Sequence, residues 1–438
     1  MFDRPQSGKD GSVRAILVHL DLDSQSDSEG LEEFRELAIS AGATPVAEIV
    51  CARRSPDAKY LIGSGKAVEV RLCVEQEEAD LVLVDYALAP SQERNLERLL
   101  CCRVLDRTGL ILDIFAQRAT SHEGRLQVEL AQLRHLSTRL IRGWTHLERQ
   151  KGGIGLRGPG ETQLETDRRL IGLRIKQLNK RLQKVRNQRD QGRRARRKAE
   201  LPTVSLVGYT NAGKSTLFNR LTESGVYVAD QLFATLDPTL RRLELPDTGP
   251  VILADTVGFI RHLPHDLVDA FRSTLEETRQ ADLLLHVVDA HNEHQGTQIQ
   301  HVNAVLREIE AGDVPQLEVM NKVDMLPNQR PRIDRDKNGV IQRVWLSAAT
   351  GEGIELLVQA LRERFSSARI RDWVRVPAAS GRLRAKLYAL GKVHRECAED
   401  SGDLLLDVEM SRKDFAGLEK SEGLRLSVDE RVAINGCG

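Results

Sequence analysis

The 438-residue sequence has few cysteines, no long apolar run and no excess charge of either sign. Six cysteines without any Cys-x-x-Cys spacing are too sparse for a disulfide scaffold in a chain of this length, so we expect reduced thiols. No apolar run reaches about 18 residues, the length that suggests a membrane span, and Met1–Gln6 form no apolar signal core. We therefore expect a cytoplasmic protein that neither spans a membrane nor is secreted.

The balance of 64 Lys and Arg against 64 Asp and Glu indicates no partner by itself, but the charge is unevenly distributed. Residues 168–198 contain fourteen Lys or Arg and a single acid, Asp190. The densest part, Arg193–Lys198, favours contact with nucleic-acid phosphates, which gives strong, salt-sensitive binding without sequence readout. The alternative is a solvated helix face.

The length of the chain suggests two to four domains. Residues 13–106 alternate short apolar runs with helical patterns, which predicts a small parallel sheet with covering helices in an amino-terminal domain, 1–120. The expected strands are 13–20, 46–51 and 81–84, and the expected helices are 31–40, 67–76 and 91–100. Gly63–Lys66 lacks the first glycine and the hydroxyl residue of a phosphate loop, and we interpret it as the start of a helix.

Residues 121–200 carry two apolar series at alternating spacings of four and three, which predict an antiparallel helical hairpin. Between them, Lys151–Gly160 contains five glycines and a proline, which no helix would tolerate, so we expect an exposed tip. Ile154, Leu156 and two cations favour a functional tip over a plain linker. The two series are Leu126, Leu130, Leu133, Ser137, Leu140, Trp144, Leu147 and Leu164, Ile171, Ile175, Leu178, Leu182, Val185.

A complete phosphate-binding loop follows the apolar run Val204–Val207. A strand that ends in a glycine turn and opens a helix directs backbone N–H groups and the positive end of the helix toward polyphosphate. Lys214 is expected to reach the β- and γ-phosphates, and Ser215 to bind Mg²⁺. The loop consists of Gly208, Tyr209, Thr210, Asn211, Ala212, Gly213, Lys214, Ser215 and Thr216.

Two further segments supply magnesium ligands. Thr235 can bind Mg²⁺ directly, and Asp255, at the end of an apolar strand, can hold it through water. The predicted metal ligands are therefore Ser215, Thr235 and Asp255. The segments expected to contact the nucleotide are Phe233, Ala234, Thr235, Leu236, Asp237 and Asp255, Thr256, Val257, Gly258.

Recognition of the base is predicted at two more strand ends. The carboxylate of Asp324 can accept two hydrogen bonds from guanine, whereas adenine offers no such donor pair. Leaving a buried carboxylate unpaired costs about 1–3 kcal/mol, so guanine should be preferred. Backbone N–H groups of the second segment are suited to closing over the guanine oxygen. The segments are Asn321, Lys322, Val323, Asp324 and Ser347, Ala348, Ala349.

These five elements, in this order and at these strand ends, resemble a translation-factor-type GTPase over residues 201–365. Beyond a break at Ser366–Ser367, short apolar runs at 387–393 and 404–408 predict strands of a small α+β domain, 366–438. The expected fold is thus α/β: an amino-terminal parallel-sheet domain, a helical hairpin, a P-loop GTPase domain and a small α+β domain.

Two long motifs, Gly158–Arg169 and Phe233–Thr239, closely resemble the HflX family of GTPases. The resemblance implies a bacterial cytoplasmic GTPase, monomeric in solution, that binds GTP and GDP. It also implies binding to the large (50S) ribosomal subunit and its 23S rRNA, and separation of stalled or idle ribosomes under stress, with the glycine-rich tip near the peptidyl-transferase region. Some members are reported to use ATP and unwind RNA. A nucleotide-dependent RNA helicase or chaperone is therefore the alternative function, and a binding module that only senses nucleotide is another.

The candidate catalytic residues are Lys214, Thr235, Gly258 and Asn211. Many GTPases place a water-orienting glutamine where this chain has Phe259, so intrinsic turnover should be slow. Asn211 matches a position at which potassium-activated GTPases of related families bind a monovalent cation; either K⁺ is a second cofactor or Asn211 only supports the loop. Arg261 and His262 either approach the γ-phosphate on a ribosome or remain solvated.

Overall fold

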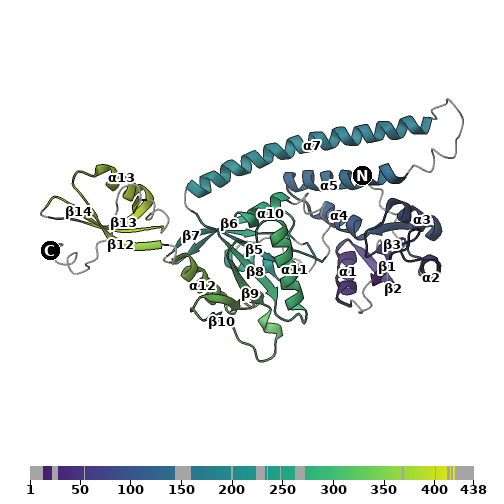
Figure 1. Cartoon of the computed structure of the whole chain (residues 1–438). Helices are drawn as coiled ribbons and strands as arrows, with labels where there is room; N and C mark the ends of the chain where they lie inside the picture. The colour runs from purple at the N-terminus through teal and green to yellow at the C-terminus, as the bar shows by residue number, and fades with distance from the viewer. Residues whose placement is uncertain are drawn as a thin grey trace. The chain divides into compact units, whose positions relative to one another are not determined.

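The computed structural model describes residues 13–21, 28–53, 55–143, 159–198, 201–222, 232–233, 235–246, 248–261, 272–366, 369–399, 401–411, 415 and 418–419. The chain falls into two compact units, divided at Glu352–Gly353, with residues 244–250 grouped with the second (Figure 1). Within the described residues, no helix is long and apolar enough to cross a membrane.

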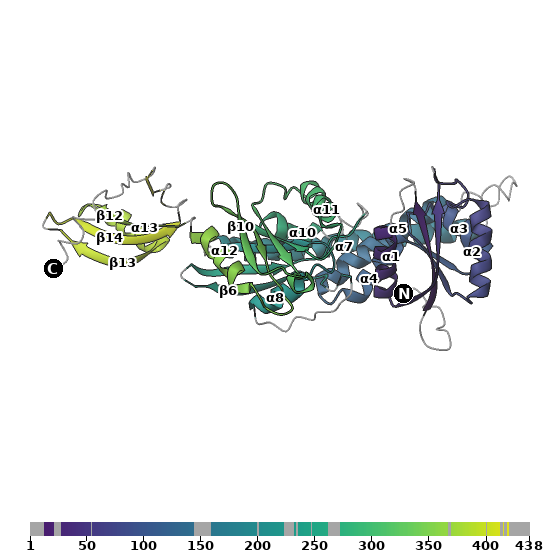
Figure 2. The same ribbon diagram turned by 90° about the horizontal axis from the view of Figure 1, so that it is seen from below.

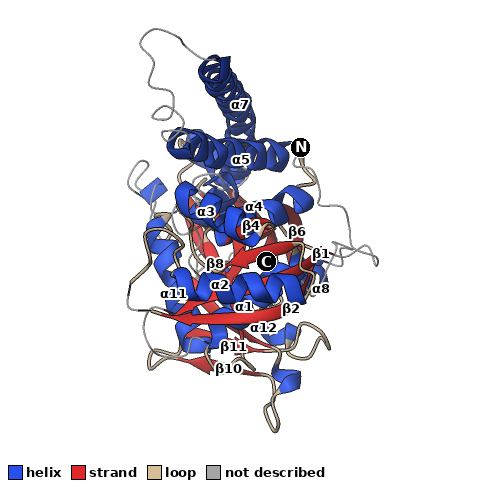
Figure 3. Cartoon of the chain, turned by 90° about the vertical axis from the view of Figure 1, so that its right-hand side faces the viewer, coloured by secondary structure: helices blue, strands red, loops and turns tan. Residues whose placement is uncertain are grey.

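The amino-terminal part contains a parallel four-stranded sheet in the order β2-β1-β3-β4. Figure 3 draws the strands in red and labels β1, β2 and β4 of this sheet. Residues 15–21 and 81–84 are buried throughout, because helices cover a parallel sheet on both faces. The predicted parallel-sheet domain with covering helices is confirmed. Its elements are β1 (Val13–Asp21), α1 (Ser28–Ser40), β2 (Ala43–Ala52), α2 (Ser64–Gln76), β3 (Leu81–Val84), α3 (Pro90–Leu100), β4 (Arg103–Asp106) and α4 (Arg107–Arg118).

The short glycine segment Gly63–Lys66 starts a helix, as predicted. Gly63 caps α2 with φ 84°, a conformation that favours glycine. A Cβ at this residue would also lie 2.1 Å from Nη1 of Arg53.

The helices α5 (His122–Gly143) and α7 (Pro159–Lys198) pack along one apolar seam. The ion pairs Glu129–Arg174 (2.6 Å) and Glu123–Arg189 (2.8 Å) run in opposite sequence directions, so the helices are antiparallel, as predicted. The buried residues of the seam are Leu126, Leu130, Leu178 and Leu182.

The predicted non-helical tip, 151–160, extends two residues too far. Pro159 and Gly160 already belong to α7. Proline is tolerated in the first turn because the N–H that it lacks would have no helical partner there. Residues 151–158 of the tip lie outside the described residues, as do the side chains of Leu140, Trp144, Leu147 and Leu164.

The next part of the chain forms a seven-stranded sheet in the order β10-β11-β9-β8-β5-β7-β6. Strands β7, β5, β8, β9 and β11 pair in parallel, and β10 is antiparallel to β11. Figure 2 shows α8 and α11 on opposite faces. The elements are β5 (Thr203–Gly208), α8 (Lys214–Thr222), β6 (Thr239–Leu245), β7 (Gly249–Asp255), α10 (Arg272–Arg279), β8 (Leu283–Asp289), α11 (Gln295–Glu308), β9 (Gln316–Asn321), η1 (Val323–Met325), β10 (Arg332–Arg335) and β11 (Ile341–Trp345).

The second unit contains an antiparallel sheet in the order β12-β14-β13 and confirms the α+β prediction. The predicted strand 387–393 is wrong, because α13 continues to Leu390. Leu383 and Leu387, one helical turn apart, both enter the core, and this short apolar run fits a helix as well as a strand. The elements are α12 (Ile354–Ser366), β12 (Arg369–Val376), α13 (Gly381–Leu390), β13 (Gly391–Ala398) and β14 (Leu404–Ser411).

The expectation of reduced thiols holds for four cysteines and is wrong for a fifth. Free thiols occur at Cys51, Cys73, Cys101 and Cys102. Cys397, in β13, is disulfide-bonded. A bond of this kind depends on the distance between two cysteines in space, which their scarcity in the sequence does not reveal.

One histidine lies inside the central sheet. His286 of β8 pairs with Val207 of β5, is 1% exposed, and has no hydrogen-bond partner for Nδ1 among the described residues. Burial, with a smaller contribution from the charge of Lys214, lowers the pKa of His286 from 6.5 to about 4. The fold therefore keeps this imidazole neutral.

We predict that acidification destabilises the protein through His286. Because the folded-state pKa is lower than the unfolded-state pKa, stability is full above pH 6.5 and is lost as pH falls toward 4. The loss from this residue between pH 7 and pH 5 amounts to about 2 kcal/mol. Urea unfolding at both pH values should show a smaller difference in His286→Leu than in the parent protein, whereas His291→Leu, an exposed control, should leave the difference unchanged. Equal pH differences in the parent and His286→Leu would contradict the prediction.

Candidate nucleotide-binding site

The predicted phosphate loop lies between β5, which ends at Gly208, and α8, which begins at Lys214. Gly208 has φ 147°, and a Cβ there would lie 2.2 Å from the carbonyl oxygen of Val287. Gly213 has φ 89°, and its Cβ would lie 2.2 Å from Nδ2 of Asn321. Both positions require glycine, and the chain turns tightly enough to direct N–H groups toward one point at the start of α8.

Lys214 is buried at the start of α8. Its ammonium donates a hydrogen bond to the carbonyl of Tyr209 at 2.7 Å. Burial lowers the pKa of Lys214 to about 8, although the carboxylate of Asp255 opposes the change. A Cβ at Gly258 would lie 2.9 Å from this ammonium, so glycine at 258 leaves the room that Lys214 occupies.

The three predicted magnesium ligands converge. The hydroxyl oxygens of Ser215 and Thr235 are 2.7 Å apart, and they lie 2.8 and 2.9 Å from the same oxygen, Oδ2, of Asp255. Asp255 is fully buried, and its other oxygen, Oδ1, has no hydrogen-bond partner among the described residues. Burial raises the pKa of Asp255, although Ser215, Lys214 and Thr235 oppose the change. A set of hard oxygen donors around a buried, incompletely paired carboxylate fits Mg²⁺.

The segment after Asp255 is clipped to the phosphate loop by backbone bonds. The N–H of Thr210 donates to the carbonyl of Phe259 (2.8 Å), and the N–H of Phe259 donates to the carbonyl of Gly208 (3.1 Å). The ring of Phe259 is 2% exposed, so it belongs to the core. Val257 is also buried, and the hydroxyl of Thr256 donates to the carbonyl of Leu206 (2.5 Å). Asn211, with φ 60°, is exposed.

Asn321 joins the phosphate loop to the predicted base-binding loop. Its Nδ2 donates to the carbonyl of Ala212 (2.8 Å), and its Oδ1 accepts the N–H of Ala348 (2.9 Å). Lys322 adopts φ 66° and forms an ion pair with Asp289 (2.7 Å).

The predicted base-selecting residue, Asp324, is exposed within η1. A base bound against this carboxylate would remove it from water, and the penalty for leaving it unpaired would then apply, so the preference for guanine stays a prediction. Val323, its neighbour in sequence, is buried, and so are Ser347 and Ala348 in the loop after β11. Ala349 is exposed, and Thr216 is half-buried in α8.

Residues 232–237, here called the first switch segment, direct most of their side chains away from the magnesium ligands. Phe233 packs edge-on against Phe115 of α4, with ring centroids 4.7 Å apart. Leu236 is buried. The carboxylate of Asp237 accepts the N–H groups of Thr120 (3.1 Å) and Ser121 (2.7 Å) just before α5 begins. Only Thr235 faces Ser215 and Asp255; Ala234 lies outside the described residues.

Residues 258–261, here called the second switch segment, are also held by the amino-terminal domain. The N–H of Arg261 donates to the hydroxyl of Tyr209 (2.8 Å), and the carbonyl of Arg261 accepts from Nη2 of Arg107 (2.8 Å). Its guanidinium pairs with Glu29 (2.7 Å), so Arg261 does not extend toward the phosphate loop. His262 lies outside the described residues.

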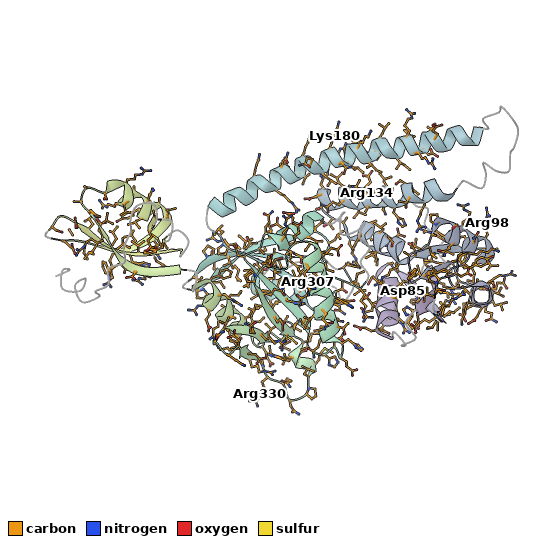
Figure 4. All side chains as sticks on the ribbon, viewed as in Figure 1. Asp85, Arg98, Arg134, Lys180, Arg307 and Arg330 are labelled. Carbon is orange, nitrogen blue, oxygen red and sulfur yellow. The ribbon has the colours of Figure 1, made fainter. Side chains whose placement is uncertain are left out.

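Glu33 of α1 lies at the centre of this contact and was missed from the sequence. Its carboxylate accepts hydrogen bonds from both Arg107 and Tyr209. Arg107 also contacts Asp85 (2.6 Å), labelled in Figure 4, which in turn bonds His19 (2.7 Å). Burial and the charge of Glu33 raise the pKa of Tyr209, so its hydroxyl keeps its proton and can donate to Glu33. The sequence shows Glu33 only as a charged residue within a helical pattern, and this does not indicate which residues it contacts.

Comparison with known proteins gives three matching family models. Residues 28–116 match the GTP-binding GTPase N-terminal model, residues 118–196 the GTP-binding GTPase middle region, and residues 203–322 the 50S ribosome-binding GTPase model. Among solved structures, a GTP-binding protein from the archaeon Sulfolobus solfataricus in complex with GDP is 24% identical with a TM-score of 0.44, covering 81% of this chain and 99% of its own.

Curated relatives match most of the chain. GTPase HflX of Escherichia coli (strain K12) is 60% identical over 422 residues, which cover 96% of this chain and 98% of that protein. GTPase HflX of Magnetococcus marinus is 48% identical over 372 residues, covering 83% of this chain and 84% of that protein. The chain therefore belongs to the HflX family of GTPases.

Proposed function

We propose that GTP bound at this site controls association with the large ribosomal subunit and its 23S rRNA, and that the bound protein separates stalled or idle ribosomes into subunits under stress. The observation that carries the proposal is the position of Thr235. It meets Ser215 and Asp255 on one side, while its neighbour Asp237 bonds the start of α5 on the other. A change in the contact between the γ-phosphate and Thr235 would thus be transmitted through Asp237 to the start of the helical hairpin.

We assign the site residues as follows. Ser215 and Thr235 would hold Mg²⁺ directly and Asp255 through water, residues 208–216 would surround the phosphates, and residues 321–324 with 347–349 would bind guanine. Mg²⁺ supplies neutralisation of the charge that develops on the phosphates during hydrolysis. Lys214 adds a fixed positive charge beside the transferred group, and burial in a water-poor site strengthens its effect.

The helical hairpin offers a cationic face to RNA. Described cations on α7 that are exposed include Arg169, Lys176, Lys180 and Lys184. Such a face supports contact with RNA phosphates. We propose that the four parts, 1–120, 121–200, 201–365 and 366–438, divide these tasks, with RNA contact in the second and nucleotide control in the third.

We infer that the hydrolysis step requires a positive charge beyond that of Lys214. Phe259 is buried, and Arg261 is paired with Glu29, so neither orients water nor stabilises the phosphoryl group here. We propose that K⁺ at Asn211 supplies this charge. Asn211 is exposed and has a left-handed backbone conformation, so its side chain would be accessible to such an ion.

We predict that Thr235→Ala weakens binding of a non-hydrolysable GTP analogue by about tenfold in Mg²⁺, equivalent to about 1.4 kcal/mol, because one metal ligand is lost. The variant should also fail to sediment with the large ribosomal subunit. Thr235→Ser, which retains the hydroxyl, is the matched control and should behave like the parent protein. Sedimentation of the parent protein that is absent, or equal in every nucleotide state, would refute control by GTP.

Deletion of residues 152–160 should leave GTP binding unchanged and abolish ribosome splitting. The nucleotide contacts lie in another part of the chain, whereas the tip would approach ribosomal RNA. A second variant, in which a Gly-Ser segment of equal length replaces residues 152–160, distinguishes the effect of losing the tip sequence from the effect of shortening the chain. Splitting that persists in both variants would remove the tip from the mechanism.

GTP turnover in K⁺ should exceed turnover in Na⁺ by about tenfold or more, equivalent to about 1.4 kcal/mol in the barrier, because we propose a site that holds K⁺ and not the smaller, more strongly hydrated Na⁺. In Asn211→Ala the two salts should give the same rate. Equal rates in the parent protein would exclude K⁺ from this site.

A further inference from the structure

We propose that Arg220 is a positioning residue for guanine recognition. It holds residues 347–350, the base loop, so that the N–H of Ala349 faces the base. Arg220 lies on α8, the helix that begins with Lys214 and Ser215. No role was expected for it from the sequence. The inference rests on the proposed assignment of residues 347–349 to the base.

The guanidinium of Arg220 contacts two successive carbonyls of the base loop. Nη2 donates to the carbonyl of Ala349 at 2.5 Å, and Nε lies 3.4 Å from the carbonyl of Ala348. A Cβ on Gly351 would lie 3.5 Å from Cζ of Arg220, so the guanidinium also packs beside the turn that closes the loop. A planar fork of N–H donors suits two carbonyls on consecutive residues.

The direction of a carbonyl fixes the direction of the next N–H. In a trans peptide, the carbonyl of one residue and the N–H of the next point in opposite directions. The carbonyl of Ala348 faces Arg220, so the N–H of Ala349 points away from α8. The N–H of Thr350, which follows the carbonyl of Ala349, is likewise turned inward and donates to the hydroxyl of Ser347 at 3.1 Å.

The opposite edge of the base loop is held by Asn321. Its Oδ1 accepts the N–H of Ala348, while its Nδ2 is bonded to the phosphate loop at Ala212. Arg220 thus donates to the carbonyls of Ala348 and Ala349, whereas Asn321 accepts the N–H of Ala348 on the other side of the loop. Ser347, Ala348 and Thr350 use their N–H groups within the fold, which leaves the N–H of Ala349 for a ligand. This donor fits the O6 acceptor of guanine and disfavours a base without it.

Arg220 also joins the base loop to the phosphate-binding helix. Ser215 and Arg220 are five residues apart on α8, so base and phosphate contacts share one rigid element. Without Arg220, both carbonyls would bond water, and the peptide planes could rotate at little cost. The N–H of Ala349 would then face the base only part of the time, and affinity would fall by that fraction.

The test compares GDP with the diphosphate of 2-aminopurine riboside, which lacks O6. In Arg220→Ala, affinity for GDP should fall about tenfold, while affinity for the 2-aminopurine nucleotide stays the same, so the preference for GDP shrinks by about tenfold. Arg307→Ala, which removes an exposed arginine of α11 labelled in Figure 4, is the matched control and should change neither affinity. Circular dichroism should show the same melting temperature for all three proteins.

The two possible failures can be told apart. If both nucleotides lose affinity equally in Arg220→Ala, or if neither does, Arg220 has no part in reading O6. If the parent protein binds ADP as tightly as GDP, the proposed base site itself fails, whatever Arg220 does.

Discussion

The buried carboxylate of Asp255 is the constraint on which the nucleotide site depends. A charge removed from water is costly unless hydrogen bonds or an opposite charge compensate it. Here Lys214 contributes its charge, and two hydroxyls meet a single oxygen, while Oδ1 remains unpaired among the described residues. The incompletely compensated negative charge of Asp255 favours binding of a divalent cation. The same charge attracts the hydroxyl of Thr235 and so brings it beside Ser215. The position of the first switch segment is thus tied to the electrostatics of one strand end.

The second switch segment depends on a different buried charge. Arg107, 6% exposed, lies between Glu33 and Asp85, and its Nη2 also reaches the carbonyl of Arg261. Removing one partner of a buried ion pair costs about 3–5 kcal/mol, because the other charge remains unpaired. Moving Arg261 therefore requires the buried group of Glu33, Arg107 and Asp85 to rearrange or to become hydrated. The amino-terminal domain is in this sense part of the GTPase site.

The sequence predicted those features that depend on neighbours along the chain. The strands around the phosphate loop, the glycine turns at Gly208 and Gly213, and the apolar seam of the hairpin all follow from local patterns. The contact of Glu33 with Tyr209 spans 176 residues, and that of Arg107 with Arg261 spans 154. No local pattern indicates such partners, since a charged residue on a helix is usually solvated.

The residues of the first switch segment show the same limit in a different way. Asp237 belongs to a motif assigned to the nucleotide, and its carboxylate accepts the N–H groups of Thr120 and Ser121, just before α5 begins. Motif membership identified the segment but not the direction of each side chain. Direction is set by packing against the amino-terminal domain, and this becomes visible only in three dimensions.

Both switch segments contact the amino-terminal domain, and this makes their responses interdependent. Phe233 and Asp237 bind α4 and the start of α5, while Arg261 binds α1 and Arg107. A ligand that stabilises Thr235 against Asp255 therefore also stabilises the docked amino-terminal domain. By linkage, any partner that shifts that domain must change the affinity for the ligand by the same factor. A partner that acts on the hairpin would thus alter nucleotide affinity without approaching the phosphate loop.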